Sequence, residues 1–217
     1  MIITNLDEIR MQVAVPASPG LPDFIHELLS QSGALLDGHF SLQGGAHAGK
    51  FVRFRNIGRD RQLVDRVAER VRSSLDFEVS SMVVLAPESA GFFLGEAFAR
   101  LHGLKLAVAQ IDARRAPIQQ LRFGELAPGA RVLLVNDVAT TGGSLQALRE
   151  LVLAAGATLA GVAVFSTLDG KRFNARLAEW GVPGRFLVEA RWPTYSPAEC
   201  PLCSETKLVA FPATELN

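Results

Sequence analysis

A stretch in the second half of the chain combines the residue types that bind a phosphate group. The apolar run of residues 132–135 ends in Asn136 and Asp137, and Val138-Ala139-Thr140-Thr141-Gly142-Gly143-Ser144 follows. Glycines let a backbone approach an anion closely, and a helix that begins after them points its free N–H groups at the same place. Asp137, at the end of the strand, can accept hydrogen bonds from ribose hydroxyls beside that phosphate.

Other phosphate motifs fit this stretch less well. It has no P-loop lysine, and its glycines do not have the spacing of the dinucleotide fingerprint. One alternative is a plain strand-to-helix turn in which the hydroxyls only cap the helix. The order of strand, acid, loop and helix favours a phosphate site. We predict that it comprises Asn136, Asp137, Ala139, Thr140, Thr141, Gly142, Gly143 and Ser144.

The two cysteines, Cys200 and Cys203, are candidate zinc ligands near the C-terminus. Their spacing is typical of half a zinc site, but a tetrahedral structural site needs four ligands. No second pair is evident in the sequence, where His26, His39 and His47 all lie far from the cysteines. A zinc site shared across a dimer, a redox-active pair and a simple buried turn are the alternatives.

The elements that must position these groups alternate from residue 79 onward. Continuous apolar runs separated by helical patterns predict an α/β fold, a parallel sheet with helices on both faces. Ligands bind such sheets at the carboxyl ends of the strands. The predicted strands are residues 82–86, 104–109, 131–135, 159–165 and 185–189, and the predicted helices are 91–102, 144–155 and 172–180.

The chain before residue 79 has a different pattern. Helices are predicted around residues 22–32 and 61–74, with a polar, glycine-containing stretch between them. We interpret this part as a small N-terminal hood beside the sheet. The predicted division is therefore residues 1–78 for the helical or hood region, 79–191 for the core and 192–217 for a C-terminal extension that carries the cysteines.

Composition limits the partners. The 22 basic and 22 acidic residues cancel, so we expect no nucleic-acid partner. The most apolar run, residues 151–165, is shorter than the roughly 20 residues of a membrane span, so we expect no membrane partner. The N-terminus has no secretory signal pattern. A cytoplasmic protein is the expectation.

Several segments together resemble a known family. Residues 132–144 are similar to the phosphoribosyl-pyrophosphate motif of type I phosphoribosyltransferases. Residues 32–47, with Gly38-His39-Phe40, resemble an N-terminal segment of the orotate phosphoribosyltransferases. Pro87-Glu88-Ser89-Ala90-Gly91 is similar to the pyrophosphate loop of the family, and Trp192-Pro193 with residues 200–203 matches a C-terminal signature of one orotate branch. The resemblance spans about residues 25–203.

The resemblance implies transfer of 5-phosphoribose from phosphoribosyl pyrophosphate to orotate, which yields orotidine 5′-monophosphate and pyrophosphate. It also implies a homodimer, a mobile loop that excludes water, and Mg²⁺ as cofactor with Asp137 as a candidate ligand. The pyrophosphate would meet Glu88, Ser89, Ala90 and Gly91, and the base would meet Gln43, His47 and Thr167.

Four positions depart from the pattern of the family. Asn136 replaces one of two acidic residues, so it can hydrogen-bond a hydroxyl but offers no charge. The loop of residues 109–121 lacks the expected lysine and has Arg114 and Arg115 instead. These two arginines and Asp137 are our candidate catalytic residues.

The other two departures concern the base. Ser166-Thr167 stand where an Asp-Arg pair would hold the orotate carboxylate, and residues 44–48 read Gly-Gly-Ala-His-Ala where Ser-Gly-x-His-Ser is expected. The leading hypothesis is an orotate-type transferase of pyrimidine nucleotide biosynthesis. The alternatives are a regulatory homologue that binds the donor without catalysis, and a transferase for another base.

Overall fold

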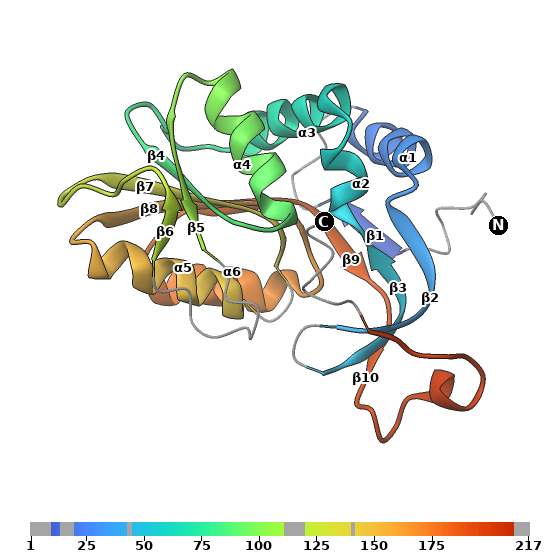
Figure 1. Cartoon of the computed structure of the whole chain (residues 1–217). Helices are drawn as coiled ribbons and strands as arrows, with labels where there is room; N and C mark the ends of the chain where they lie inside the picture. The colour runs from blue at the N-terminus through green and yellow to red at the C-terminus, as the bar shows by residue number, and fades with distance from the viewer. Residues whose placement is uncertain (1–9, 14–19, 43–44, 111–119, 140–141, 211–217) are drawn as a thin grey trace.

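Two β-sheets organise the computed structural model, which describes residues 10–13, 20–42, 45–110, 120–139 and 142–210 (Figure 1). The larger core sheet has the strand order β1-β9-β8-β7-β4-β5-β6, and the smaller sheet has the order β10-β3-β2-β11. The strands of the core sheet are β1 (Arg10–Val13), β4 (Val83–Pro87), β5 (Lys105–Ala109), β6 (Leu121–Phe123), β7 (Arg131–Ala139), β8 (Thr158–Thr167) and β9 (Gly184–Arg191).

The centre of the core sheet is parallel, as predicted. Strands β4, β5, β7, β8 and β9 pair in parallel, whereas β1 and β6 add antiparallel edges. Strand β7 continues beyond its predicted end, because Asn136 pairs with Val164 and Ala139 with Thr167 of β8. The polar pair that ends the apolar run is therefore held inside a regular strand.

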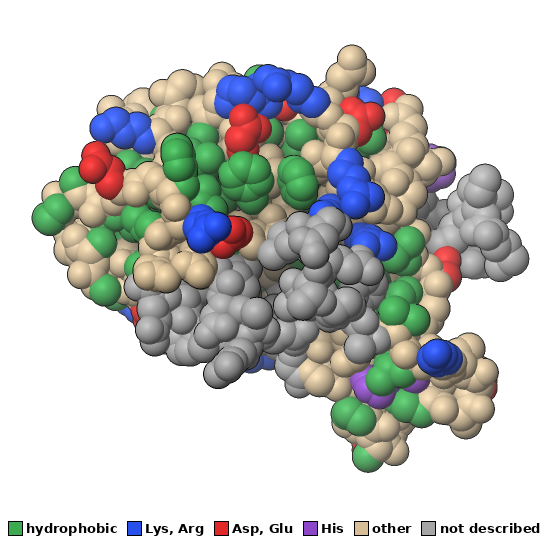
Figure 2. All heavy atoms as spheres, in the orientation of Figure 1, with side chains coloured by type: hydrophobic (Ala, Val, Ile, Leu, Met, Phe, Trp, Pro, Cys, Tyr) green, Lys and Arg blue, Asp and Glu red, His purple; other side chains and the backbone are tan. Residues whose placement is uncertain are grey.

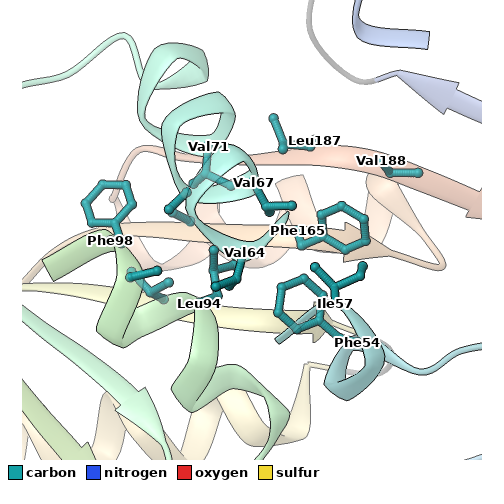
Figure 3. Packing of buried hydrophobic residues seen from close by; sticks show 14 of the residues in the cluster. Phe54, Ile57, Val64, Val67, Val71, Leu94, Phe98, Phe165, Leu187 and Val188 are labelled. Atoms are coloured by element: carbon teal, nitrogen blue, oxygen red, sulfur yellow. The ribbon is translucent and has the colours of Figure 1, made fainter. Parts of the chain in front are cut away.

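Helices cover both faces of the core sheet, which confirms the predicted fold class (Figure 1). One hydrophobic cluster joins the sheet to α1–α4, and a second joins it to α5 and α6. Figure 3 shows the first cluster, in which Phe54 of α2 stacks against Phe165 of β8 with ring centroids 5.2 Å apart. The helices are α1 (Leu21–Ser32), α2 (Phe54–Gly58), α3 (Arg61–Ser74), α4 (Ala90–Leu101), α5 (Gly143–Ala154) and α6 (Gly170–Trp180).

The smaller sheet joins the two ends of the chain. Strands β2 (Leu35–Ser41) and β3 (His47–Val52) form a hairpin from the polar stretch between the first two predicted helices. Strand β10 (Thr194–Tyr195) pairs with β3, and β11 (Val209–Ala210) pairs with β2. The hairpin of the predicted hood and two short strands of the predicted C-terminal extension therefore share one sheet. The rest of the predicted hood belongs to the core, because β1 joins the core sheet and α1, α2 and α3 pack in its first hydrophobic cluster.

The surface of the described residues carries no single dominant charge. In Figure 2 basic side chains lie in small groups, several of them beside acidic ones. Ion pairs such as Arg100–Asp65 and Arg66–Glu27 connect neighbouring elements. Among the described residues, no helix has both the length and the apolar character that crossing a membrane requires.

Candidate functional site

The carboxyl edge of the core sheet brings together two of the predicted segments, the pyrophosphate loop and the phosphate site. Strand β4 ends at Pro87, and residues 88–89 lead into α4. Strand β7 ends at Ala139, and Gly142 leads into α5. Because β4 and β7 are neighbours in the sheet, their two loops open on the same edge.

Asn136 and Gly91 show how closely these loops approach each other. A Cβ atom on Gly91 would lie 2.2 Å from Asn136 Oδ1 and 2.9 Å from Pro87 Cγ, so only glycine fits there. The Asn136 side chain is buried, and its amide nitrogen donates to the carbonyl of Val138 at 3.4 Å. Its Oδ1 has no hydrogen-bond partner among the described residues, which leaves one buried acceptor at this edge.

Asp137 follows Asn136 in β7 and is only partly exposed. Burial raises the pKa of its carboxyl group to about 6, and hydrogen bonds from backbone N–H groups oppose part of this rise. Burial has this effect because it penalises the charged form of an acid. A cation or a set of hydroxyl donors at this edge would stabilise the ionised carboxylate.

The predicted phosphate site is the start of α5. Gly142 has a φ of +80°, which a residue with a side chain rarely adopts, and it precedes Gly143 at the first helical position. Among the described residues no side chain caps the helix, and Ser144 lies in its first turn. Thr140 and Thr141, the other hydroxyls of the capping alternative, lie outside the described residues. The N-terminal amides of α5 are arranged to meet an anion.

The predicted pyrophosphate loop is anchored at both ends. The Glu88 amide donates to the carbonyl of Ala109 at 2.8 Å, and its carboxylate lies 3.5 Å from Arg122 Nε. Ser89 is the N-cap of α4 and accepts from the amide of Gly91 at 3.3 Å. Ala90 begins the helix, so this loop is also a strand-to-helix turn.

Thr167 is already engaged within the protein. It is buried, and its hydroxyl donates to the carbonyl of Ala139 at 2.9 Å and accepts from the amide of Asp169. Its side chain thus ties the end of β8 to the end of β7. This use of the hydroxyl leaves little capacity for a base.

A small cleft of about 20 Å³ lies between the core sheet and the smaller sheet. Two of its walls carry buried polar atoms, Ser166 Oγ and Trp192 Nε1, which have no hydrogen-bond partner among the described residues. Neither was among our candidate base-binding residues. The lining consists of Leu42, Phe51, Val52, Val138, Ser166, Leu168 and Trp192.

A second small cleft, of about 10 Å³, borders the start of α5. Gly142 and Thr167 line it together with two basic side chains of α6, Arg172 and Arg176. Arg176 also contacts Gln146 at 3.5 Å. Neither arginine was among our candidate site residues, although their spacing of four residues places them on one helix face.

The remaining candidates lie elsewhere. His47 packs against His39, Cys200 and Cys203 in the smaller sheet, and the four side chains form one cluster. The sequence analysis found no second ligand pair for the cysteines, because the histidines are about 160 residues away. Five candidates lie outside the described residues: Gln43, Arg114, Arg115, Thr140 and Thr141.

Comparison with known proteins adds the following. The model of the phosphoribosyl transferase domain matches residues 55–174. An orotate phosphoribosyltransferase of Chlorobaculum parvum is 32% identical over 88% of this chain and 94% of its own length. One of Thermotoga maritima is 33% identical over 83% of this chain and 92% of its own.

Solved structures agree on the fold. Orotate phosphoribosyltransferase from Aeropyrum pernix has a TM-score of 0.64 at 22% identity and covers 75% of this chain and 92% of its own. Adenine phosphoribosyltransferase from Trypanosoma brucei, in complex with AMP, pyrophosphate and ribose-5-phosphate, has a TM-score of 0.56 at 20% identity. It covers 76% of this chain and 78% of its own.

Proposed function

This chain belongs to the phosphoribosyltransferase family, and from that premise we propose that it transfers 5-phosphoribose from phosphoribosyl pyrophosphate to orotate. Relatives about 32% identical over most of the chain carry the orotate enzyme's name. The observation that carries the proposal is the contact between Gly91 and Asn136, which joins the pyrophosphate loop to the strand end that leads into the phosphate site.

In this proposal the carboxyl edge binds the donor. The start of α5 would hold the 5′-phosphate, and the Asp137 carboxylate would accept from the ribose hydroxyls. The loop of residues 88–91 would contact the pyrophosphate through its backbone. Protein groups orient the donor and stabilise the charge that develops on the leaving group, so no covalent nucleophile is needed.

Mg²⁺ fits the donor atoms at this edge. The Asp137 carboxylate is a hard oxygen ligand of the kind that Mg²⁺ prefers. Asn136 Oδ1 is buried against Gly91, and neighbouring side chains of a strand point to opposite faces, so we assign the ion to Asp137 alone. The ion, when bound with the donor, would offset negative charge on the pyrophosphate. Asn136 contributes no charge, so we expect Asp137 to carry most of the protein's electrostatic contribution.

The cleft between the two sheets is our candidate for the base. It opens beside Val138, the residue that follows Asp137, and its two unpartnered groups could hydrogen-bond a planar heterocycle. Ser166 can donate or accept, and the Trp192 indole donates. Leaving such groups buried without a partner costs about 1–3 kcal/mol each, which a bound base would recover.

The lining of the same cleft also supports a second proposal, in which the phosphoribosyl group is transferred to a base other than orotate. Orotate carries a carboxylate, and no basic side chain is among the described residues that line the cleft. This lining favours a base without a carboxylate, such as another pyrimidine or a purine. Arg114 and Arg115 lie outside the described residues.

A base panel tests these proposals. The protein is incubated with donor, Mg²⁺ and one of orotate, uracil, cytosine, adenine, guanine or hypoxanthine, and the nucleotide product is identified by mass spectrometry. Orotidine 5′-monophosphate supports the first proposal, and a different nucleotide supports the second. Donor binding by calorimetry without any product would contradict both and favour the regulatory homologue.

We also propose that the protein is a homodimer, as the resemblance implies. Light scattering coupled to size-exclusion chromatography measures the mass directly. A mass near twice that of the 23.4 kDa chain is expected, and a monomer at micromolar concentration would contradict it.

A further inference from the structure

Two histidines and two cysteines converge in the smaller sheet, far from the proposed donor site in sequence. His39 Nε2 lies 3.1 Å from His47 Nδ1 and 3.4 Å from Cys200 Sγ. Cys203 Sγ lies 3.4 Å from His47 Nδ1 and 3.8 Å from His39 Nε2. The four atoms all lie within 4.8 Å of one another.

These separations are those of ligands around a tetrahedral zinc ion. With Zn–N of about 2.05 Å and Zn–S of about 2.3 Å, tetrahedral angles put two nitrogens about 3.3 Å apart and a nitrogen and a sulfur about 3.6 Å apart. The observed nitrogen–nitrogen distance of 3.1 Å and nitrogen–sulfur distances of 3.4 to 3.8 Å agree with these values within a few tenths of an ångström.

Hydrogen bonding alone does not account for the cluster. His39 Nδ1 lies 3.1 Å from the carbonyl oxygen of Thr206, an acceptor, so the ring proton of a neutral His39 is on Nδ1. Nε2 then has a single lone pair, yet three polar atoms surround it, from His47, Cys200 and Cys203. A metal ion at the centre would accept one lone pair from each of the four side chains.

The contact with Thr206 also has the form of an outer-shell interaction in zinc sites. A ligating histidine usually donates its other ring N–H to a carboxylate or a backbone carbonyl, which fixes the ring orientation and the tautomer. His39 is 1% exposed and His47 6% exposed, so the two rings are held among protein atoms. Cys200 is buried as well, whereas Cys203 closes the cluster from the surface.

Two local structures bring these ligands together: the β2–β3 hairpin for the histidines and a short 3₁₀-helix for the cysteines. In the β2–β3 hairpin, His47 pairs with Ser41, and His39 lies two residues before Ser41 on the same face. Such diagonal neighbours are within reach of long side chains. At the other end of the chain, Cys200 caps the 3₁₀-helix Pro201–Ser204, and its carbonyl accepts from the amide of Cys203 at 3.2 Å.

We propose that His39, His47, Cys200 and Cys203 bind one Zn²⁺ ion in a structural site that fastens the C-terminal segment to the β2–β3 hairpin. Four protein ligands fill the coordination of zinc, so the site leaves no position for a substrate. The Cys₂His₂ donor set with tetrahedral spacing selects zinc over metals that prefer oxygen ligands. The segment otherwise joins the hairpin through the two-residue strands β10 and β11.

The test begins with the full-length wild-type protein, produced with zinc in the medium and without a histidine tag. Mass spectrometry of the metal should find about one zinc per chain. Removal of the zinc with a strong chelator should lower Tm by at least about 5 °C, and added zinc should restore it, because a ligand of the folded state alone stabilises that state. Replacement by Co²⁺ should give the visible bands of a tetrahedral thiolate site.

Variants connect the metal to these side chains. The double variant Cys200→Ser/Cys203→Ser should retain less than about a tenth of the zinc. The control His26→Asn changes an exposed histidine of α1 outside the cluster and should retain all of it. The cobalt spectrum and the chelation melt use only the wild type, so they decide the matter even where the double variant does not fold.

Three results would overturn the proposal. The first is a wild-type protein that holds no zinc after exposure to it, and the second is equal zinc in the wild type and the double variant. The third is a disulfide between Cys200 and Cys203 in the freshly purified protein, detected by counting free thiols after unfolding. None of these results depends on catalytic activity.

Discussion

The carboxyl edge of the core sheet and the His39–Cys203 cluster both gather polar groups, but they satisfy them in different ways. At the edge, Asn136 Oδ1 is buried without a partner among the described residues, and so is Ser166 Oγ in the adjoining cleft. In the cluster, each of the four side chains lies within bonding distance of another. The edge is incomplete without small molecules, whereas the cluster supplies a full ligand set for one ion.

This difference separates a substrate site from a structural site. Unpartnered polar groups cost stability unless a ligand satisfies them, so in the proposed function we assign those at the edge to ligand binding. A complete tetrahedral set leaves no place for a substrate. Changes at the edge should therefore act on catalysis, and changes in the cluster should act on metal content and stability.

Apart from Asp137→Asn, Gly91→Ala should have the largest effect on catalysis. Its Cβ would lie 2.2 Å from Asn136 Oδ1, so the loop of residues 88–91 must shift away from the strand end. Misplacing the reacting groups by about 1 Å can cost about 10²-fold, and we expect a loss of that order in kcat/KM. The control Gly49→Ala, whose Cβ would make an ordinary contact of 3.5 Å with Leu202, should stay within about twofold of wild type.

The pH dependence of donor binding tests whether the Asp137 carboxylate binds the donor. With a pKa of about 6, its carboxyl group is mostly protonated at pH 5 and mostly ionised at pH 7. Ribose hydroxyls donate to the ionised form, so donor affinity should rise about tenfold over this range. The Asp137→Asn variant lacks this carboxyl group, so any change of donor affinity with pH in its calorimetry comes from titration of the donor itself. An equal rise in that variant would contradict the role of the carboxylate.

The raised pKa of Asp137 also predicts that the free energy of unfolding falls as the pH rises, whereas the donor affinity rises. Because burial raises the pKa of Asp137, the folded state binds more protons than the unfolded state between about pH 4 and 6, and stability falls as pH rises through that window. Asp137→Asn should therefore gain up to about 3 kcal/mol relative to wild type between pH 4 and pH 7. Urea unfolding at the two pH values measures it, and a difference that does not change with pH would contradict the raised pKa.

Ser166→Ala tests the proposed base cleft with a smaller effect. Removal of a hydroxyl that bonds the base should raise KM for the base about five- to tenfold and leave kcat nearly unchanged. Steady-state kinetics with the base varied and the donor saturating measures both constants. A fall in kcat at unchanged KM would instead place Ser166 in the support of the strand end.

Arg122→Gln should have the smallest effect. Arg122 is exposed and lies 3.5 Å from the Glu88 carboxylate, and such surface pairs contribute about 0–1 kcal/mol. Unfolding free energy should change by less than about 0.5 kcal/mol. A loss of activity above about tenfold would show that the pair positions the pyrophosphate loop, in contrast to its weak contribution to stability.

The sequence predicted the core more completely than the hood for a physical reason. The five parallel strands of the core contain continuous apolar runs, and the phosphate site follows from consecutive residues of one loop. The short edge strands β1 and β6 contain polar residues and were not predicted. In the hairpin, exposed residues such as Asp37 and Gly38 interrupt the apolar pattern, and a register shift follows them, so no strand was predicted. His39 and His47 become neighbours only through that hairpin, and the cysteines reach them only through the full fold. The unpartnered state of Asn136 Oδ1 and Ser166 Oγ is likewise a property of packing, which the spacing of residues does not contain.

The central claim is that the carboxyl edge performs phosphoribosyl transfer, and pyrophosphate release tests it most directly. The initial rate is measured with donor, Mg²⁺ and orotate, or with the base that the panel identifies, for wild type and Asp137→Asn side by side. We predict steady release by wild type and a rate at least about 10²-fold lower for the variant, because the carboxylate that orients the ribose is lost. Equal rates in the two proteins, or no release by a wild type that binds the donor, would contradict the account.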